Sequence, residues 1–123
     1  MGFLDKFEGP IYALFRIVFG LLFMGHGIHK FFNFPTDFAW PLTPITITAG
    51  AIELVAGALI VVGFFTRPAA FLSSGLMAAA YWMAHGSKGF FPIANGGELA
   101  ILFSFAFLYI AAKGAGQWAI DKS

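Results

Sequence analysis

The sequence predicts an all-α integral membrane protein, a four-helix bundle whose N- and C-termini both lie on the cytoplasmic side. Of the 123 residues, 59% are hydrophobic and only 11% are charged, whereas an ordinary soluble domain has about 25% charged residues. The mean hydropathy is +0.83. The apolar residues fall into four stretches, each bounded by residues that begin or end helices. The length fits a single domain, residues 1–123.

The first two stretches, about residues 10–30 and 43–65, reach the roughly 20 residues that a bilayer requires. Pro10 suits the first turn of a helix because its missing N–H would have no partner there. Thr43 and Pro44 suit the cap and first turn of the second helix. Both stretches are therefore predicted to be transmembrane helices.

The third and fourth stretches, about residues 68–85 and 96–112, are shorter. Gly86 can close the third helix in a left-handed conformation, and Gly114 can close the fourth. The alternative is a pair of spans beside two buried or re-entrant segments. Backbone groups in lipid must form hydrogen bonds within the chain, which uninterrupted helices achieve. Because none of the four stretches has a polar face for water, four membrane helices are predicted.

Basic residues set the predicted orientation. Four spans place both termini on the same side as the connection between the second and third helices. That side carries four basic residues, Lys6, Arg67, Lys113 and Lys122, and the other side carries Lys30 and Lys88. The positive-inside rule then puts the termini in the cytoplasm, and a bacterial inner membrane is the expected location. No small-residue cleavage site follows the first stretch, which is expected to remain in the mature protein.

Composition argues against several classes of function. The net charge is +1, and there is no basic stripe to bind a nucleic acid backbone. The sequence has no cysteine, which excludes disulfides, thiolate metal sites and thiol redox chemistry. The 3 histidines and the carboxylates could ligate iron or zinc in principle. The Glu-x-x-His pattern of di-iron bundles is absent, however, and no bound metal is expected.

Two ionisable residues lie deep within the predicted helices, Arg16 in the first and Glu53 in the second. Such groups are costly in a bilayer and are candidates for function. An intramembrane ion pair between Arg16 and Glu53 is the simplest way to satisfy both charges. The pair would either fix the register of the two helices or act as a relay.

A second polar group is predicted near the outer mouth of the bundle. His26 and Lys30 are four residues apart, near the azimuth of Arg16 on the first helix. Two further faces are predicted to point inward: Ser74, Ala78, Tyr81 and His85 on the third helix, and Glu98, Leu102, Phe105 and Tyr109 on the fourth. The candidate catalytic residues are those that would then converge, His26, Lys30, His85 and Glu98. The candidate ligand-binding residues are Phe23, Tyr81, Asn95 and Phe105.

Structural interpretations of the same residues remain open. Lys30 can extend its ammonium group to the lipid headgroups. Asn95 and Glu98 have the spacing of a capping box at the start of the fourth helix.

The order and spacing of these residues resemble the DoxX family from about residue 10 to residue 121. The matching positions are Arg16, Gly20, His26, Gly27, Lys30, Gly50, Glu53, Gly57, Gly63, Thr66 to Ala70, His85 and Asn95 to Glu98. The resemblance implies four membrane helices. It also implies a link to quinone redox chemistry, because the family is named for a subunit of a thiosulfate:quinone oxidoreductase.

Three functions are consistent with the sequence. The first is a quinone-linked redox component or membrane subunit of an oxidoreductase complex, whose polar cluster hydrogen-bonds a quinone headgroup and supplies protons. Because the chain has no cysteine, an electron-carrying cofactor is expected on a redox partner protein, with quinone as the bound substrate. The second is a small-solute transporter that uses Arg16 and Glu53, in which two copies could form a homo-oligomer. The third is a non-catalytic scaffold or assembly subunit.

Overall fold

A computed structural model describes residues 2–34 and 42–122, and all regular structure within these ranges is helical. The main helices are α2 (Glu8–Phe32), α3 (Pro44–Val62), α4 (Thr66–Ala80) and α6 (Glu98–Lys113). The shorter elements are α1 (Gly2–Asp5), the π-helical turn η1 (Tyr81–His85), the 3₁₀ turn η2 (Gly86–Lys88) and α5 (Pro92–Asn95). Each predicted helical stretch thus corresponds to one main helix. Two of the described helices, α2 and α3, are long and apolar enough to cross a bilayer.

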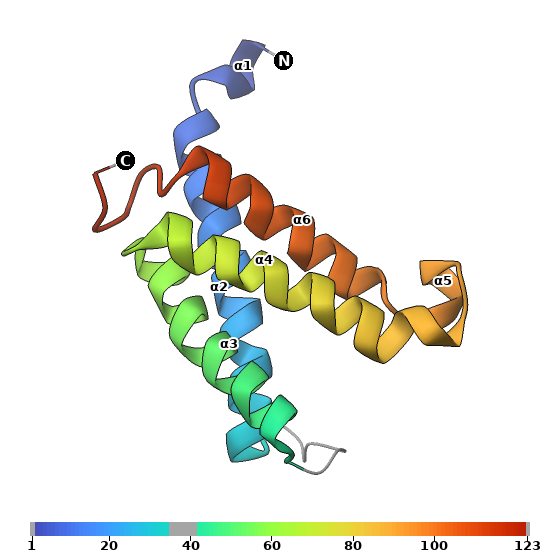
Figure 1. The fold of residues 1–123 in the computed structure, drawn as a ribbon. Coiled ribbons are helices and arrows are strands. Elements are labelled where there is room, and N and C mark those ends of the chain that lie inside the picture. The colour runs from blue at the N-terminus through green and yellow to red at the C-terminus, as the bar shows by residue number, and fades with distance from the viewer. Residues whose placement is uncertain (1, 35–41, 123) are drawn as a thin grey trace.

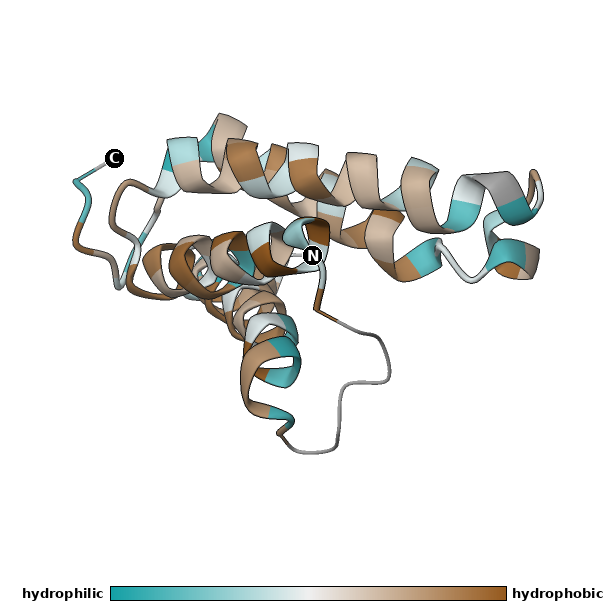
Figure 2. Ribbon diagram, turned by 60° about the horizontal axis from the view of Figure 1, so that its bottom comes forward, coloured by the Kyte–Doolittle hydropathy of each residue, from teal (hydrophilic) through white to brown (hydrophobic). Residues whose placement is uncertain are grey.

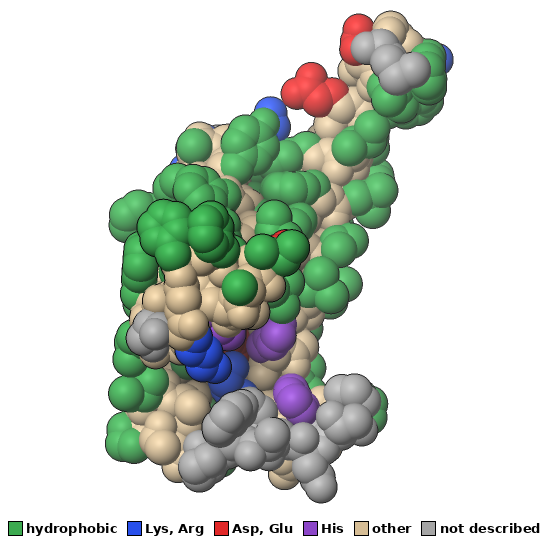
Figure 3. Space-filling view, turned by 90° about the vertical axis from the view of Figure 1, so that its right-hand side faces the viewer, with side chains coloured by type: hydrophobic (Ala, Val, Ile, Leu, Met, Phe, Trp, Pro, Cys, Tyr) green, Lys and Arg blue, Asp and Glu red, His purple; other side chains and the backbone are tan. Residues whose placement is uncertain are grey.

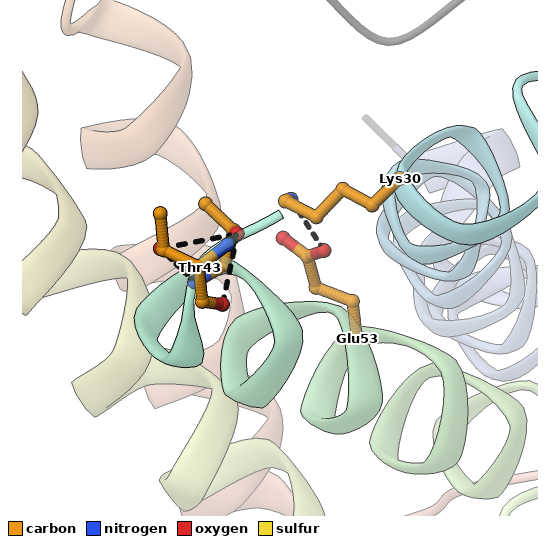
Figure 4. Close-up of polar contacts among 4 residues, drawn as sticks. Lys30, Thr43 and Glu53 are labelled. Atoms are coloured by element: carbon orange, nitrogen blue, oxygen red, sulfur yellow. Dashed lines mark hydrogen bonds and ion pairs between the residues drawn. The ribbon is translucent and has the colours of Figure 1, made fainter. Parts of the chain in front are cut away.

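Local chemistry explains most of the helix ends. At the start of α3, the hydroxyl of Thr43 accepts a hydrogen bond from the Thr46 N–H at 3.2 Å, and the Thr46 hydroxyl accepts one from the Thr43 N–H at 2.6 Å (Figure 4). This reciprocal cap agrees with the predicted cap at Thr43. The expectation for Gly86 is wrong, because its φ of −58° is right-handed. The chain leaves α4 through η1 and η2 instead, which continue the helical run to Lys88.

The helices form two antiparallel hairpins, α2 with α3 and α4 with α6, which diverge from a common corner (Figures 1 and 2). The hairpins are closest where α3 is followed by α4, and α2 contacts α6 only sparsely. The start of α2 and the C-terminal segment lie near that corner, with α1 projecting beyond it, whereas α5 and the end of α2 lie far from it and from each other (Figure 1). This divergence differs from a bundle of near-parallel helices, and it opens space between the hairpins.

Glycines set the close approach of α2 and α3. A Cβ atom on Gly20 would lie 3.1 Å from the Gly57 carbonyl oxygen, and one on Gly27 would lie 2.8 Å from the Gly50 carbonyl oxygen. Larger side chains at these positions would therefore push the two backbones apart. The two contacts fix the antiparallel register, with Gly20 against Gly57 and Gly27 against Gly50.

Aromatic side chains join the two hairpins near the middle. Phe23 of α2 is fully buried and lies with its ring centroid 4.7 Å from that of Phe107 and 5.9 Å from that of Phe103, both on α6. Edge-to-face and tilted contacts between aromatic rings stabilise the packing beyond what the burial of their apolar surface contributes. Hydrophobic residues run along all four main helices (Figure 2), and many of the large ones are exposed, among them Val55, Phe71 and Phe105, as expected when lipid rather than water surrounds the helices.

Candidate functional site

Arg16 does not pair with Glu53, contrary to the prediction. Its buried guanidinium donates five hydrogen bonds, all to backbone carbonyls. The acceptors are Ile60 and Val61 at the end of α3 and Ala115, Gln117 and Trp118 in the C-terminal segment, with distances of 3.0 Å to Ile60 and 2.7 Å to both Gln117 and Trp118. A guanidinium has five N–H groups, so this carbonyl cage uses its full donor capacity.

The helix register explains why the predicted pair does not form. Arg16 lies level with Ile60 and Val61, two helical turns from Glu53, which is a separation of about 10 Å along the axis. Helical side chains also lean towards the N-terminus of their own helix. In an antiparallel pair, this makes Arg16 and Glu53 lean apart. The same geometry makes Lys30 and Glu53 lean together.

The ion pair of this region joins Lys30 to Glu53. The Lys30 Nζ atom lies 2.6 Å from the Glu53 Oε1 atom, and the two side chains are only 14% and 4% exposed (Figure 4). Lys30 therefore does not simply extend towards the headgroups, as one interpretation of the sequence had it. A buried pair costs desolvation energy and is weak evidence for stability. Its position beside open space makes it a candidate for binding instead.

A cleft of about 320 Å³ lies next to this pair, between the two hairpins. His26 and Lys30 of α2, Glu53 of α3 and His85 of η1 all line it. On this side of the molecule, histidine and basic side chains gather near one end, whereas hydrophobic side chains dominate the rest (Figure 3). The predicted convergence of His26, Lys30 and His85 thus corresponds to a cleft, with Glu53 joining them.

A hydrogen-bond network holds His85 in place. Its Nδ1 atom lies 3.1 Å from the backbone carbonyl oxygen of Asn95. A carbonyl can only accept, so Nδ1 must carry the proton, which leaves Nε2 able to accept one. The buried Asn95 amide donates to the Tyr81 hydroxyl at 2.9 Å and to the Gly89 carbonyl at 3.1 Å, and accepts from the Gly97 N–H at 2.8 Å. Asn95 and Tyr81 therefore position the cleft wall rather than line the cleft.

The structure places several of the residues predicted for the site, on α6 and its approach, outside the cleft. Glu98 is exposed and is not among the residues that line the cleft. Phe105 is 67% exposed, on the opposite side of α6 from the buried Phe103. The capping box also fails, because Asn95 closes α5 and the residue that precedes α6 is Gly97, which has no side chain to cap it. Phe23 belongs to the core, not to the cleft.

The face of α6 that points inward differs from the predicted one, so other residues line the cleft. Phe103, Leu99, Ala100 and Gly96 line it from this side, and Met77 and Ala80 line it from α4. The His26 ring lies edge-on to Phe103, with 5.8 Å between ring centroids. Because α6 is apolar on every face, hydrophobic periodicity could not select the inward one. In the middle of α6, residues 99–108, the polar residue is Ser104, whose hydroxyl donates to the Ser74 carbonyl at 3.1 Å.

The C-terminal segment closes the opposite end of the molecule. The Tyr12 hydroxyl donates to the Gly114 carbonyl at 2.6 Å, and the Asp121 carboxylate accepts from the N–H groups of Phe65 at 3.1 Å and Thr66 at 2.8 Å. The hydrogen bond from Thr66 is the main reason that the pKa of Asp121 lies below its usual value, and the charge of Arg16 lowers this pKa further. The carboxylate also caps the N-terminus of α4, where the helix dipole favours negative charge.

In the described ranges, 2–34 and 42–122, no three His, Asp or Glu side chains come together in a group that could hold a metal ion. His26, Lys30, Glu53 and His85 bring groups that can form hydrogen bonds to the cleft.

Comparison with known proteins places the chain in a family. The DoxX family model matches residues 11–86, which include His26, Lys30, Glu53 and His85. A protein of Haemophilus influenzae, described only as an uncharacterized protein, is 44% identical over 129 aligned residues that cover 99% of this chain and 96% of the relative. No solved structure matches the chain. On this evidence, the chain belongs to the DoxX family.

Proposed function

We propose that this DoxX protein crosses a bacterial inner membrane four times, with both termini in the cytoplasm, and binds a quinone as the membrane subunit of an oxidoreductase. The apolar helices α2 and α3 support the membrane assignment. The continuous helical run of α4 and η1, residues 66–85, is about 30 Å long and could also span the hydrocarbon core. Arg67 and Lys113 lie at the corner where the hairpins meet, whereas Lys30, at the other end, is held in a buried ion pair. By the positive-inside rule, this uneven distribution of basic residues favours placing that corner on the cytoplasmic side of the membrane.

The observation that carries the proposal is the buried Lys30–Glu53 pair in the wall of a cleft that also contains His26 and His85. Ionisable side chains are rare within membrane helices and usually mark a functional site. The cleft volume of about 320 Å³ lies in the range of small-molecule sites, and its remaining lining is largely apolar and aromatic. A flat ring with two polar oxygens, the headgroup of a quinone, fits this combination.

Each polar residue has a role suited to such a headgroup. The ammonium of Lys30 can donate to a carbonyl oxygen of the ring, and so can an N–H of His26. His85, with Nδ1 bonded to the Asn95 carbonyl, can take up or release a proton at Nε2. A quinone takes up two protons with two electrons when it is reduced to the quinol. We assign the electrons to a redox partner protein, because this chain has no cysteine for an iron–sulfur centre.

The role of His26 can be tested by binding. We expect purified wild-type protein to bind decylubiquinone saturably at one site in isothermal titration calorimetry. We expect His26→Leu to weaken this binding about tenfold, because one hydrogen bond to the ring is lost within an apolar site. His29→Leu is the matched control, since His29 lies one turn away on α2 but is not among the residues that line the cleft.

Two results would contradict the proposal. One is the absence of saturable binding by a wild-type protein that is folded, as judged by its thermal unfolding. The other is an equal loss of affinity in the His26 and His29 variants, which would place the ligand elsewhere.

A further inference from the structure

A second cleft adjoins the one that contains the histidines. It has a volume of about 600 Å³ and lies between the first half of α3 and the second half of α4 with η1. Apart from two threonines and the Lys30–Glu53 pair, its lining is apolar. Four residues line both clefts: Lys30, Glu53, Met77 and Ala80. The ion pair therefore stands at the boundary between a polar compartment and an apolar one.

We infer that the two clefts form one binding site for an amphiphile, with the ring of a quinone in the histidine cleft and its isoprenoid tail in the cleft between α3 and α4. The inference rests on the proposed function and adds the class of substrate: a long-tailed, membrane-resident quinone rather than a water-soluble one. A ring that hydrogen-bonds Lys30 brings the root of its tail to the boundary that the two clefts share.

Small side chains keep the apolar cleft open. Ala49 of α3 and Ala79, Ala80 and Ala84 of α4 and η1 line it, where larger residues would fill the space. Because lipid is itself apolar, a tail gains affinity in this cleft from van der Waals packing against the cleft walls rather than from leaving water. The volume of about 600 Å³ is in the range that small-molecule ligands occupy.

A third, purely apolar groove provides a comparison on the same two helices. It has a volume of about 500 Å³ and is lined by Ala51, Val55 and Leu72 among others, with no charged residue. A lipid acyl chain could occupy either groove, because both are apolar. Of these two grooves, the cleft that contains Ala49 shares Lys30, Glu53, Met77 and Ala80 with the polar site, and this adjacency favours the tail of the same ligand as its occupant.

The experiment measures the affinity of full-length Ala49→Phe for two probes, ubiquinone-0, which has no tail, and decylubiquinone. Ala49 does not line the histidine cleft, so the variant should fill only the space for the tail. We expect at least a tenfold loss of affinity for decylubiquinone and a change of less than twofold for ubiquinone-0. Because wild type and variant are compared with the same ligand, the partition of that ligand into detergent affects both measured affinities equally. Ala51→Phe, in the third groove, should change neither affinity.

The outcomes separate the inference from the proposed function. If wild-type protein binds neither probe, the proposed function itself fails. If both probes bind and Ala49→Phe leaves decylubiquinone affinity unchanged, or Ala51→Phe lowers it equally, the ring site stands and the tail assignment is overturned. Ala84→Phe repeats the test from the other wall of the cleft, in case Ala49→Phe does not fold.

Discussion

The two deeply placed cations of α2 have opposite surroundings. Arg16, at the closed end, is fully buried and directs all five N–H groups to backbone carbonyls. Lys30, at the open end, lies against the carboxylate of Glu53 and lines two clefts. The sequence presents both as ionisable residues in an apolar helix. The surroundings show that one joins parts of the fold and the other faces space that a ligand can enter.

The kind of partner decides what each charge can do. Backbone carbonyls belong to the fold and cannot change their charge, so Arg16 is suited to hold the C-terminal segment against α3. A carboxylate can exchange partners and protons, so the Lys30–Glu53 pair can respond to a ligand. Burial alone would not distinguish a structural charge from a functional one.

The largest effect on stability is expected at Arg16. Arg16→Leu removes the guanidinium donor from five buried carbonyls, and we expect it to lower the free energy of unfolding by about 3–5 kcal/mol and to release the C-terminal segment. Thermal unfolding and limited proteolysis after residue 114 would measure the two consequences. Arg67→Leu is the matched control, because Arg67 also donates to carbonyls, of Ala111 and Ala112, but is exposed and can be replaced by water. Equal stability of the two variants would contradict a structural role for Arg16.

An intermediate effect is expected when the Lys30–Glu53 pair is broken. Glu53→Met leaves the Lys30 ammonium without its carboxylate, and we expect a loss of about 1–3 kcal/mol in the free energy of unfolding. The loss is smaller than at Arg16 because the Lys30 side chain is 14% exposed and flexible enough to reach water. Chemical unfolding in detergent would measure it. A loss that matches or exceeds that of Arg16→Leu would remove the distinction between the two ends.

The smallest effect is expected at Asp121, where we predict a dependence on pH. The pKa of this carboxyl is lowered in the folded protein, chiefly by the N–H of Thr66. The carboxylate therefore stabilises the fold above its usual pKa of 3.8, and this contribution is lost as the pH falls through the lower folded-state pKa. Asp121→Asn should lower the thermal midpoint slightly at pH 7, and the difference should vanish in strong acid. Asp5→Asn, in the exposed α1, is the control, and an equal loss of thermal midpoint in this variant at pH 7 would contradict the role of Asp121.

The helical segments could be predicted from the sequence because long apolar stretches and caps are local signals. The inward face of α2 could be predicted as well, since Arg16, Gly20, Phe23 and Gly27 are all buried. The divergence of the hairpins and the rotation of α6 could not be predicted, because a helix that is apolar on all sides gives no preference for one neighbour.

The hydrogen-bond partners of Arg16 could not be predicted from the sequence for a different reason. Every residue has a carbonyl, so a carbonyl cage leaves no trace in side-chain patterns. The partner of Glu53 did leave a signal. Gly20 and Gly27 are seven residues apart, as are Gly50 and Gly57, and an antiparallel pairing of these glycines sets Glu53 near Lys30 and away from Arg16.

The most direct test of a ligand-binding role for the Lys30–Glu53 pair removes both charges at once. Paired apolar replacement of a buried ion pair is often neutral for stability, so we expect Lys30→Met combined with Glu53→Met to unfold within about 1 kcal/mol of wild type. We predict that this folded double variant loses at least tenfold in affinity for decylubiquinone. Wild-type affinity in a stable double variant would contradict the account.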